Sequence, residues 1–166
     1  MILMDLNEQA DRDFGRARRK AWLRRLMLRL RKERFACSTS VSFDKVRRSL
    51  RAYNRVHRGL RLVDPEKIVG SVGRRNDFDR CFMPLRAGVG KRWKRVDLAF
   101  YKDMALPPVS LYKLGDVYFV EDGNHRVSVA RYHGVRAVEA NVTEFRPARV
   151  QSRDAGRASE PERRAA

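Results

Sequence analysis

The segment that decides the fold spans residues 116–134 and reads DVYFVEDGNHRVSVARYHG. An apolar stretch typical of a strand comes first, a glycine follows at position 123, and a helix is predicted to open with His125 and Arg126. Glycine permits a positive φ angle in the turn, and the first amides of a helix have no partner inside it. An anion placed here would meet backbone donors, the positive end of the helix dipole and a guanidinium. The pattern therefore predicts a phosphate-binding turn.

Each residue of this turn has a predicted role. Gly123 allows close backbone approach, Asn124 caps the helix and offers its amide to the ligand, and Arg126 pairs with a phosphate. His125 donates to a phosphate oxygen, or transfers a proton if a substrate hydroxyl comes within reach. Asp122 is predicted to face the same site and hold a Mg²⁺ ion that bridges phosphates. The pattern is equally typical of a plain strand-to-helix turn with His125 and Arg126 in solvent.

The flanking sequence predicts a strand at residues 109–113, a second at 117–121 and a last one at 135–142. A helix around Trp93 buries apolar residues, exposes basic ones and ends before the proline pair that begins at Pro107. The phosphate turn is thus expected between the second of these strands and the helix that leads to the last one.

This order of elements around an Asp-Gly-Asn-His-Arg turn resembles the ParB N-terminal and sulfiredoxin superfamily, which includes ParB-like nuclease domains. The likeness covers a little over half the chain, from about Leu62 to Phe145. It implies an α+β fold, with a small mixed β-sheet packed with helices. It also implies a bound nucleoside triphosphate, ATP or CTP, with Mg²⁺. In the family an arginine loop comes back toward the nucleotide, and Arg75 is the matching residue here.

The sequence also differs from the members of the superfamily that it resembles. Sulfiredoxins are similar through a Gly-Gly-Cys-His-Arg loop, but Asn124 replaces the cysteine, so sulfinic acid reduction is not expected. ParB proteins that bind CTP carry Gly-Glu-Arg-Arg, of which Gly123 and Arg126 agree. Kinases that phosphorylate free serine look similar in an Asp-Gly-His loop that Asp122 fits. A small-molecule phosphotransferase with Glu66 as base is therefore an alternative to a binding module, and a ParB-like nuclease is a third.

Composition narrows the partners. The 166 residues carry a formal net charge of +18, which favours polyanions such as nucleic acid or anionic lipid. No apolar run approaches the roughly 18 residues of a membrane span, and no secretory signal is evident. The expected location is the cytoplasm. A homodimer or a protein partner is left open.

The excess charge is concentrated in residues 1–60, where 17 Lys and Arg face 6 Asp and Glu, giving +11 of the +18. Apolar residues at helical spacing predict a basic helix over residues 8–35 and a second helix over residues 43–58. The predicted organisation is a basic helical extension at 1–60, a ParB/sulfiredoxin-like domain at 61–146 and a disordered tail at 147–166.

The first basic helix has three open interpretations. Its apolar stripe can pack against the second predicted helix or against the sheet while the arginines face water, or Trp22 and its neighbours can lie on a membrane surface. The stripe consists of Phe14, Trp22, Leu23, Leu26, Met27 and Leu30. The favoured hypothesis is that its cations bind nucleic acid phosphates, with a steep dependence on salt. The cations predicted to do so are Arg18, Arg19, Lys20, Arg24, Arg25 and Arg29.

Overall fold

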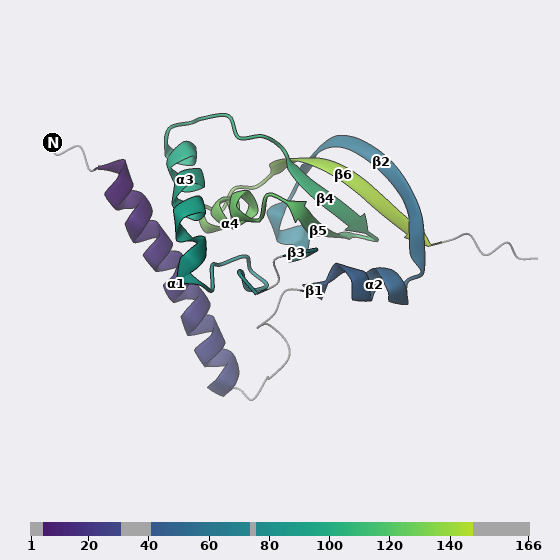
Figure 1. Ribbon diagram of the computed structural model, residues 1–166, viewed down its shortest axis with the longest axis horizontal. Helices are drawn as coiled ribbons and strands as arrows, with labels where there is room; N and C mark the ends of the chain where they lie inside the picture. Colours follow the sequence, from purple (N-terminus) through teal and green to yellow (C-terminus); the bar gives the residue numbers. More distant parts are fainter. Residues whose placement is uncertain (1–4, 31–40, 74–75, 148–166) are drawn as a thin grey trace, which may run out of the picture.

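The computed structural model describes residues 5–30, 41–73 and 76–147, with the side chains of residues 29 and 30 excluded. Four α-helices, six strands and two short 3-10 helices lie in this part of the chain (Figure 1). The helices are α1 (Leu6–Leu30), α2 (Phe43–Ser49), α3 (Gly90–Tyr101) and α4 (Asn124–Tyr132). The strands are β1 (Val41–Ser42), β2 (Ala52–Val63), β3 (Ile68–Ser71), β4 (Val109–Leu114), β5 (Val117–Asp122) and β6 (Val138–Pro147). The 3-10 helices are η1 (Pro65–Lys67) and η2 (Ala87–Val89).

The six strands form one mixed sheet in the order β1-β3-β5-β4-β6-β2. The β4 strand lies antiparallel to β5 and parallel to β6, while β3 lies parallel to both β1 and β5. The long β2 and β6 strands pair antiparallel along nearly their whole lengths. This arrangement confirms the predicted α+β fold with a small mixed sheet.

Each face of the sheet is covered by helices. On one face α4 and α3 pack against the sheet, and α1 lies outermost alongside α3; α2 covers the other face (Figure 1). The first face holds the larger apolar cluster, which includes Trp93, Val109, Leu111, Val120, Val127 and Val142. The second holds a smaller cluster of Phe43, Ala52, Leu114, Phe119 and Phe145. The side chains alternate between the faces, as the period of a strand requires.

The first helix docks through its small residues. Ala10, Ala17 and Ala21 are buried, and the ring of Phe14 covers Gly90, where a Cβ atom would lie 2.8 Å from it. Burial of the apolar stripe, one of the three interpretations left open for this helix, therefore does not hold for most of its members, because alanines allow a close helix–helix approach that large side chains would prevent. The large apolar residues of the second half of the helix are exposed instead, namely Trp22, Leu23, Leu26 and Met27.

The predicted second helix was wrong beyond its first two turns. Helix α2 ends at Ser49, Arg51 takes a positive φ angle of 48°, and the chain enters β2 at Ala52. The spacing of apolar residues up to Tyr53 is helical, but backbone pairing with β6 and burial of Ala52 outweigh it. The predicted border between residues 60 and 61 falls inside this strand.

The other predicted elements agree more closely. The strands at 109–113 and 117–121 and the helix around Trp93 are confirmed as β4, β5 and α3. The last strand begins at Val138 rather than residue 135, because Gly134 ends the preceding helix with a φ angle of 67° and the next residues form the turn. The predicted end of the first helix at residue 35 lies outside the described residues, and so does the predicted tail apart from its first residue, Pro147, which ends β6 instead.

The docking of α1 predicts a sharp response to a larger side chain. Ala17→Leu places three extra carbons at a position that is 0% exposed, and overpacking of this kind costs about 1–3 kcal/mol. Urea unfolding should show this loss, whereas Arg19→Leu on the exposed side of the same helix should change stability by less than about 0.5 kcal/mol. Equal stability of the two variants would contradict the docking geometry.

Candidate functional site

A cavity of about 300 Å³ lies at the start of α4, where the phosphate-binding turn was predicted. Side chains from α3, the segment after it and the turn itself form its walls. The lining residues are Arg92, Arg95, Val96, Leu106, Pro107, Asp122, Gly123, Asn124, His125 and Arg126. The structure thus gathers Asp122 to Arg126 around one cavity, while Arg75 lies outside the described residues.

Gly123 sets the geometry of the turn. Its φ angle is 102°, in the region that favours glycine, and a Cβ atom here would lie 2.7 Å from Cγ1 of Val109. Its carbonyl accepts the first hydrogen bond of the helix, from the amide of Val127 at 3.0 Å. The amides of Asn124 and Arg126 therefore precede the helical hydrogen-bond ladder, at the positive end of the helix dipole.

Arg126 is held in place by three acceptors. Its guanidinium donates to the carbonyls of Pro107 and Pro108, the latter at 2.9 Å, and to the Asp122 carboxylate at 2.7 Å. These contacts tie the start of α4 to the segment between α3 and β4. Arg126 lines the cavity with donors already engaged, so its role toward a phosphate stays a prediction.

Asn124 and His125 are both buried at the cavity wall. The prediction that Asn124 caps the helix was wrong, because Gly123 occupies the cap position and Asn124 is the first helical residue. Within the described part of the chain, Oδ1 of Asn124 has no hydrogen-bond partner. A buried acceptor of this kind calls for a donor or a cation, from a water molecule, an ion or a ligand. The ring of His125 packs edge-on against Phe78 at 5.3 Å.

Asp122 is the one acidic side chain among the residues that line this cavity. It is 76% exposed and paired with Arg126, whereas the neighbouring Glu121 accepts a hydrogen bond from Tyr112. Burial and this hydrogen bond raise the pKa of Tyr112. A single exposed carboxylate fits a Mg²⁺ ion that takes its remaining ligands from phosphates and water. It does not provide a site for two metal ions.

Two cations at the cavity escaped the sequence-based prediction. Arg92 and Arg95 project from α3, are exposed, and form no ion pair within the described residues. Positions 92 and 95 are one helical turn apart, so they lie on the same side of the helix. The sequence did contain an indication of them, namely two basic residues at helical spacing in the predicted helix before the proline pair. What the sequence alone did not show is that this helix runs beside the turn.

A second, apolar cavity adjoins the first. It measures about 360 Å³ and shares with the cationic cavity the residues Val96, Leu106, Pro107 and Arg126. Its further lining is mostly aliphatic and aromatic, with one carboxylate, from Phe100, Ala105, Val109, Val129, Ala130, Val135, Val138 and Glu139. Together the two cavities offer an apolar compartment beside a cationic one, with Arg126 between them.

The cations predicted on the first helix separate into groups. Arg18, Arg19 and Arg25 line a groove of about 270 Å³ together with Trp22, Pro84 and Leu85. Lys20 instead lies over the ring of Tyr132 at 4.8 Å, and Arg24 is paired with the buried Asp79 at 2.8 Å. The side chain of Arg29 lies outside the described residues.

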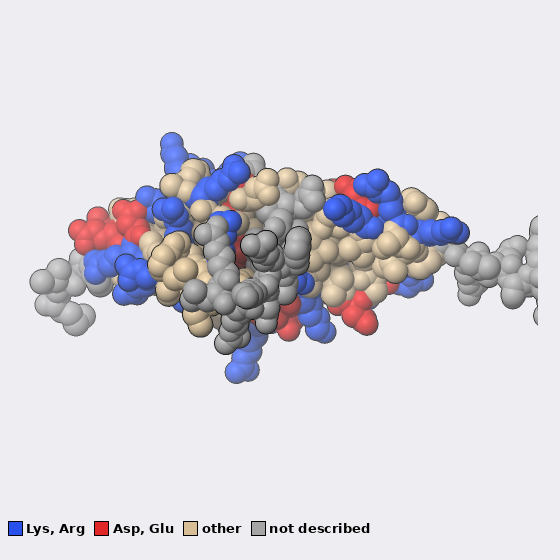
Figure 2. Space-filling model, turned by 90° about the horizontal axis from the view of Figure 1, so that it is seen from below, with Lys and Arg blue, Asp and Glu red and all other residues tan. Residues whose placement is uncertain are grey.

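Basic side chains are not confined to one region of the surface. Figure 2 shows Lys and Arg over the α1 end of the molecule and again over the opposite end, with acidic side chains beside the start of α1. The described helices include none that is long and apolar enough to cross a bilayer.

No family model matches the sequence, and a search of curated proteins found no match. A sulfiredoxin from Arabidopsis thaliana is similar in structure over 50% of this chain and 82% of its own, at 17% identity and a TM-score of 0.37. A likeness this distant carries no argument about the site. The fold and the cavities described above stand on the strand order and geometry of this chain.

The turn geometry predicts that Gly123→Ala is strongly destabilising. The new Cβ atom would clash with Val109, and the left-handed backbone alone costs an alanine about 1–2 kcal/mol. Urea unfolding should therefore show a loss of about 2 kcal/mol or more.

Gly88→Ala is the matched control for this change. Nothing lies within 4 Å of its ideal Cβ position and its φ angle is not in the left-handed region, so stability should hold or rise slightly. A Gly123→Ala variant as stable as Gly88→Ala would show that the turn tolerates a side chain.

Proposed function

We propose that the paired cavities bind a nucleoside triphosphate, with its phosphates at the start of α4. The observation that carries the proposal is that Arg92 and Arg95, with no ion pair of their own among the described residues, face the same cavity as the first turn of α4. Guanidinium groups and the amides at a helix start are the two kinds of donor that proteins most often direct at phosphates.

The adjoining apolar cavity supports a nucleotide over a simple phosphate. Its volume of about 360 Å³ is in the usual range of small-ligand sites, and its walls are apolar apart from Arg126 and Glu139. A nucleobase placed there would leave its phosphates to reach Arg92 and Arg95 past Arg126. The orphan Oδ1 of Asn124 would then accept a hydrogen bond from the ligand or contact its cation.

A Mg²⁺ ion would be held by Asp122 together with the phosphates, and would neutralise part of their charge. The small number of carboxylates at the cavity favours a binding module over a phosphotransferase or a nuclease. Glu66 does not line the cavity and is paired with Arg131, so the predicted base of a phosphotransferase is absent from the cavity wall. A nuclease that uses two metal ions would need more carboxylates than Asp122 supplies.

Calorimetric titration tests the proposal. ATP, CTP and GTP with Mg²⁺ are titrated into the wild-type protein and into Arg92→Ala/Arg95→Ala. Loss of two charge-assisted contacts, each worth about 1.5–3 kcal/mol, should weaken binding by roughly 100-fold or more. Phosphate release from the same samples measures any turnover, and added serine tests for transfer to a hydroxyl acceptor.

Lys91→Ala/Lys102→Ala is the matched control. It removes two exposed positive charges from the same helix and its cap, away from the lining of this cavity. It should retain nearly all affinity. Equal weakening in both double variants would mean that only net charge matters, and no binding of any nucleotide to the wild type would refute the proposal.

The groove on α1 favours a second function, association with single-stranded nucleic acid. Trp22 is 60% exposed and stands among Arg18, Arg19 and Arg25 at this groove. An exposed aromatic ring supplies a platform on which a base can stack, and flanking arginines neutralise phosphates. The combination is typical of surfaces that bind a single strand with little sequence preference.

Fluorescence anisotropy with a labelled single-stranded oligonucleotide tests this surface. Trp22→Ala should weaken binding about tenfold while leaving the salt dependence unchanged, because stacking releases no counterions. Arg18→Ala/Arg25→Ala should lower the salt dependence. Tyr53→Ala, which removes a ring of similar exposure from β2, is the control and should bind as the wild type does. An effect of Tyr53→Ala equal to that of Trp22→Ala would contradict a specific stacking platform.

A further inference from the structure

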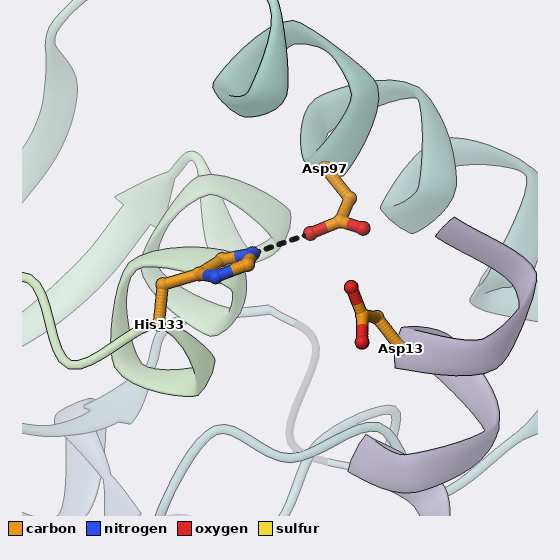
Figure 3. Close-up of side chains that lie close together, drawn as sticks. All are labelled: Asp13, Asp97 and His133. Atoms are coloured by element: carbon orange, nitrogen blue, oxygen red, sulfur yellow. Dashed lines mark hydrogen bonds and ion pairs between the residues drawn. The ribbon is translucent and has the colours of Figure 1, made fainter. Parts of the chain in front are cut away.

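Two buried carboxylates and an imidazole meet where three helices join, at the opposite end of α4 from the phosphate cavity. Asp13 comes from α1, Asp97 from α3 and His133 from the residue that caps the end of α4 (Figure 3). One ligand atom from each lies within 4.8 Å of the others. It is the one group of three or more such side chains among the described residues.

Asp97 is buried with only one of its two carboxylate oxygens hydrogen-bonded in the described part of the chain. Its side chain is 0% exposed, Oδ1 contacts Nε2 of His133 at 2.7 Å, and Oδ2 has no hydrogen bond in the described part of the chain. Figure 3 shows this carboxylate facing the carboxylate of Asp13 across the junction. A buried anionic oxygen without a donor is costly, and a second carboxylate facing it adds repulsion. A cation between the two would remove both penalties.

The surroundings of Asp13 fix it as an anion. Tyr101 and Tyr132 donate to its two oxygens at 2.6 and 2.7 Å, and Gln9 donates at 3.1 Å. Burial opposes its ionisation, but the hydrogen bonds from Tyr101, Tyr132 and Gln9 and the nearby His133 together outweigh burial and hold its pKa below the usual value. Burial, together with the bond to Asp13, raises the pKa of Tyr132 to about 12, so this phenol stays a donor. Metal-binding carboxylates are commonly held by outer hydrogen bonds in this way.

His133 provides a nitrogen ligand and a route from solvent. Its ring stacks on Phe100 at a centroid distance of 4.2 Å and meets the rings of Tyr101 and Tyr132 edge-on. These contacts fix the plane of the imidazole. Its side chain is 14% exposed, more than either carboxylate, so an ion would enter past it.

We propose that Asp13, Asp97 and His133 bind a divalent transition-metal ion, with Zn²⁺ as the best fit. One imidazole and two carboxylates suit Zn²⁺ and its first-row neighbours, whereas Mg²⁺ prefers oxygen ligands alone. Ligand atoms around a tetrahedral zinc lie roughly 3.3 Å apart, so the three side chains draw together by small rotations when the ion binds. The ion replaces the hydrogen bond between His133 and Asp97, and water completes the coordination.

The bound ion would cross-link three helices of the fold. The ion joins α1, α3 and α4, so binding should stabilise the docked position of α1 and raise the unfolding temperature. This site is separate from the nucleotide cavity, and either can exist without the other.

The test uses the chain of 166 residues without a histidine tag, stripped with a chelator. Zn²⁺ is titrated by calorimetry, thermal unfolding is followed with and without Zn²⁺, and Co²⁺ serves as a spectroscopic substitute. The expected result is one saturable site, a higher unfolding temperature with Zn²⁺, and a Co²⁺ spectrum of nitrogen and oxygen ligands. Mg²⁺ at the same concentration should give none of these.

Two variants and one control locate the ion. His133→Gln keeps a donor toward Asp97, so it should fold and yet bind Zn²⁺ roughly 100-fold more weakly. Asp97→Asn should do the same, and circular dichroism checks that both variants are folded. His57→Gln removes an exposed histidine of β2 and should bind as the wild type does.

Three outcomes overturn the proposal. They are the lack of a saturable site in the stripped wild type, an affinity that His133→Gln leaves unchanged, and a thiolate-to-cobalt absorption band that would place the ion on cysteine.

Discussion

The rest of the structure depends on the backbone of one residue, Gly123. Its φ angle of 102° turns the chain from β5 into α4 within a single residue, and the lack of a side chain lets this turn lie against Val109 of the neighbouring strand. The direction of α4 follows from this turn. The start of the helix then faces the cationic cavity, and its end brings His133 to the junction with α1 and α3.

Helix α3 links the two ends of α4 because its sides carry different chemistry. Arg92 and Arg95 face the cavity at the start of α4, while Asp97 is buried toward His133 at its end, and Trp93 donates to Ser128 midway at 2.8 Å. The cations Arg92 and Arg95 thus lie at the proposed phosphate site, and the carboxylates of Asp13 and Asp97 lie at the proposed metal site. The expected ligands also suit the dipole of α4, which favours an anion at its start and a cation at its end.

The sequence predicted what is decided locally. A glycine before a helical pattern, the proline pair after α3 and the strands on either side of a Gly-Asp turn are read from neighbouring residues, and all are present. It failed where distant segments decide. Strand β2 is held in place by pairing with β6, and Arg58 on β2 bonds to Glu144 on β6, 86 positions away in the chain. The residues near β2 in the sequence do not predict this partner. Arg92 and Arg95 were missed for the same reason, since their helix meets the turn only in the folded chain.

The docking of α1 through alanines explains why its arginines and its large apolar residues share one surface. A helix that buries Leu and Trp shows its charges on the far side, but this one buries Ala10, Ala17 and Ala21 and keeps Trp22 outside among arginines. Close approach needs small side chains, and it brings Asp13 of the same buried stripe within reach of α3 and α4. The groove beside Trp22 and the junction of Asp13 with Asp97 and His133 therefore both result from the docking of α1 through alanines. A change that moves α1 away from α3 should disturb both together.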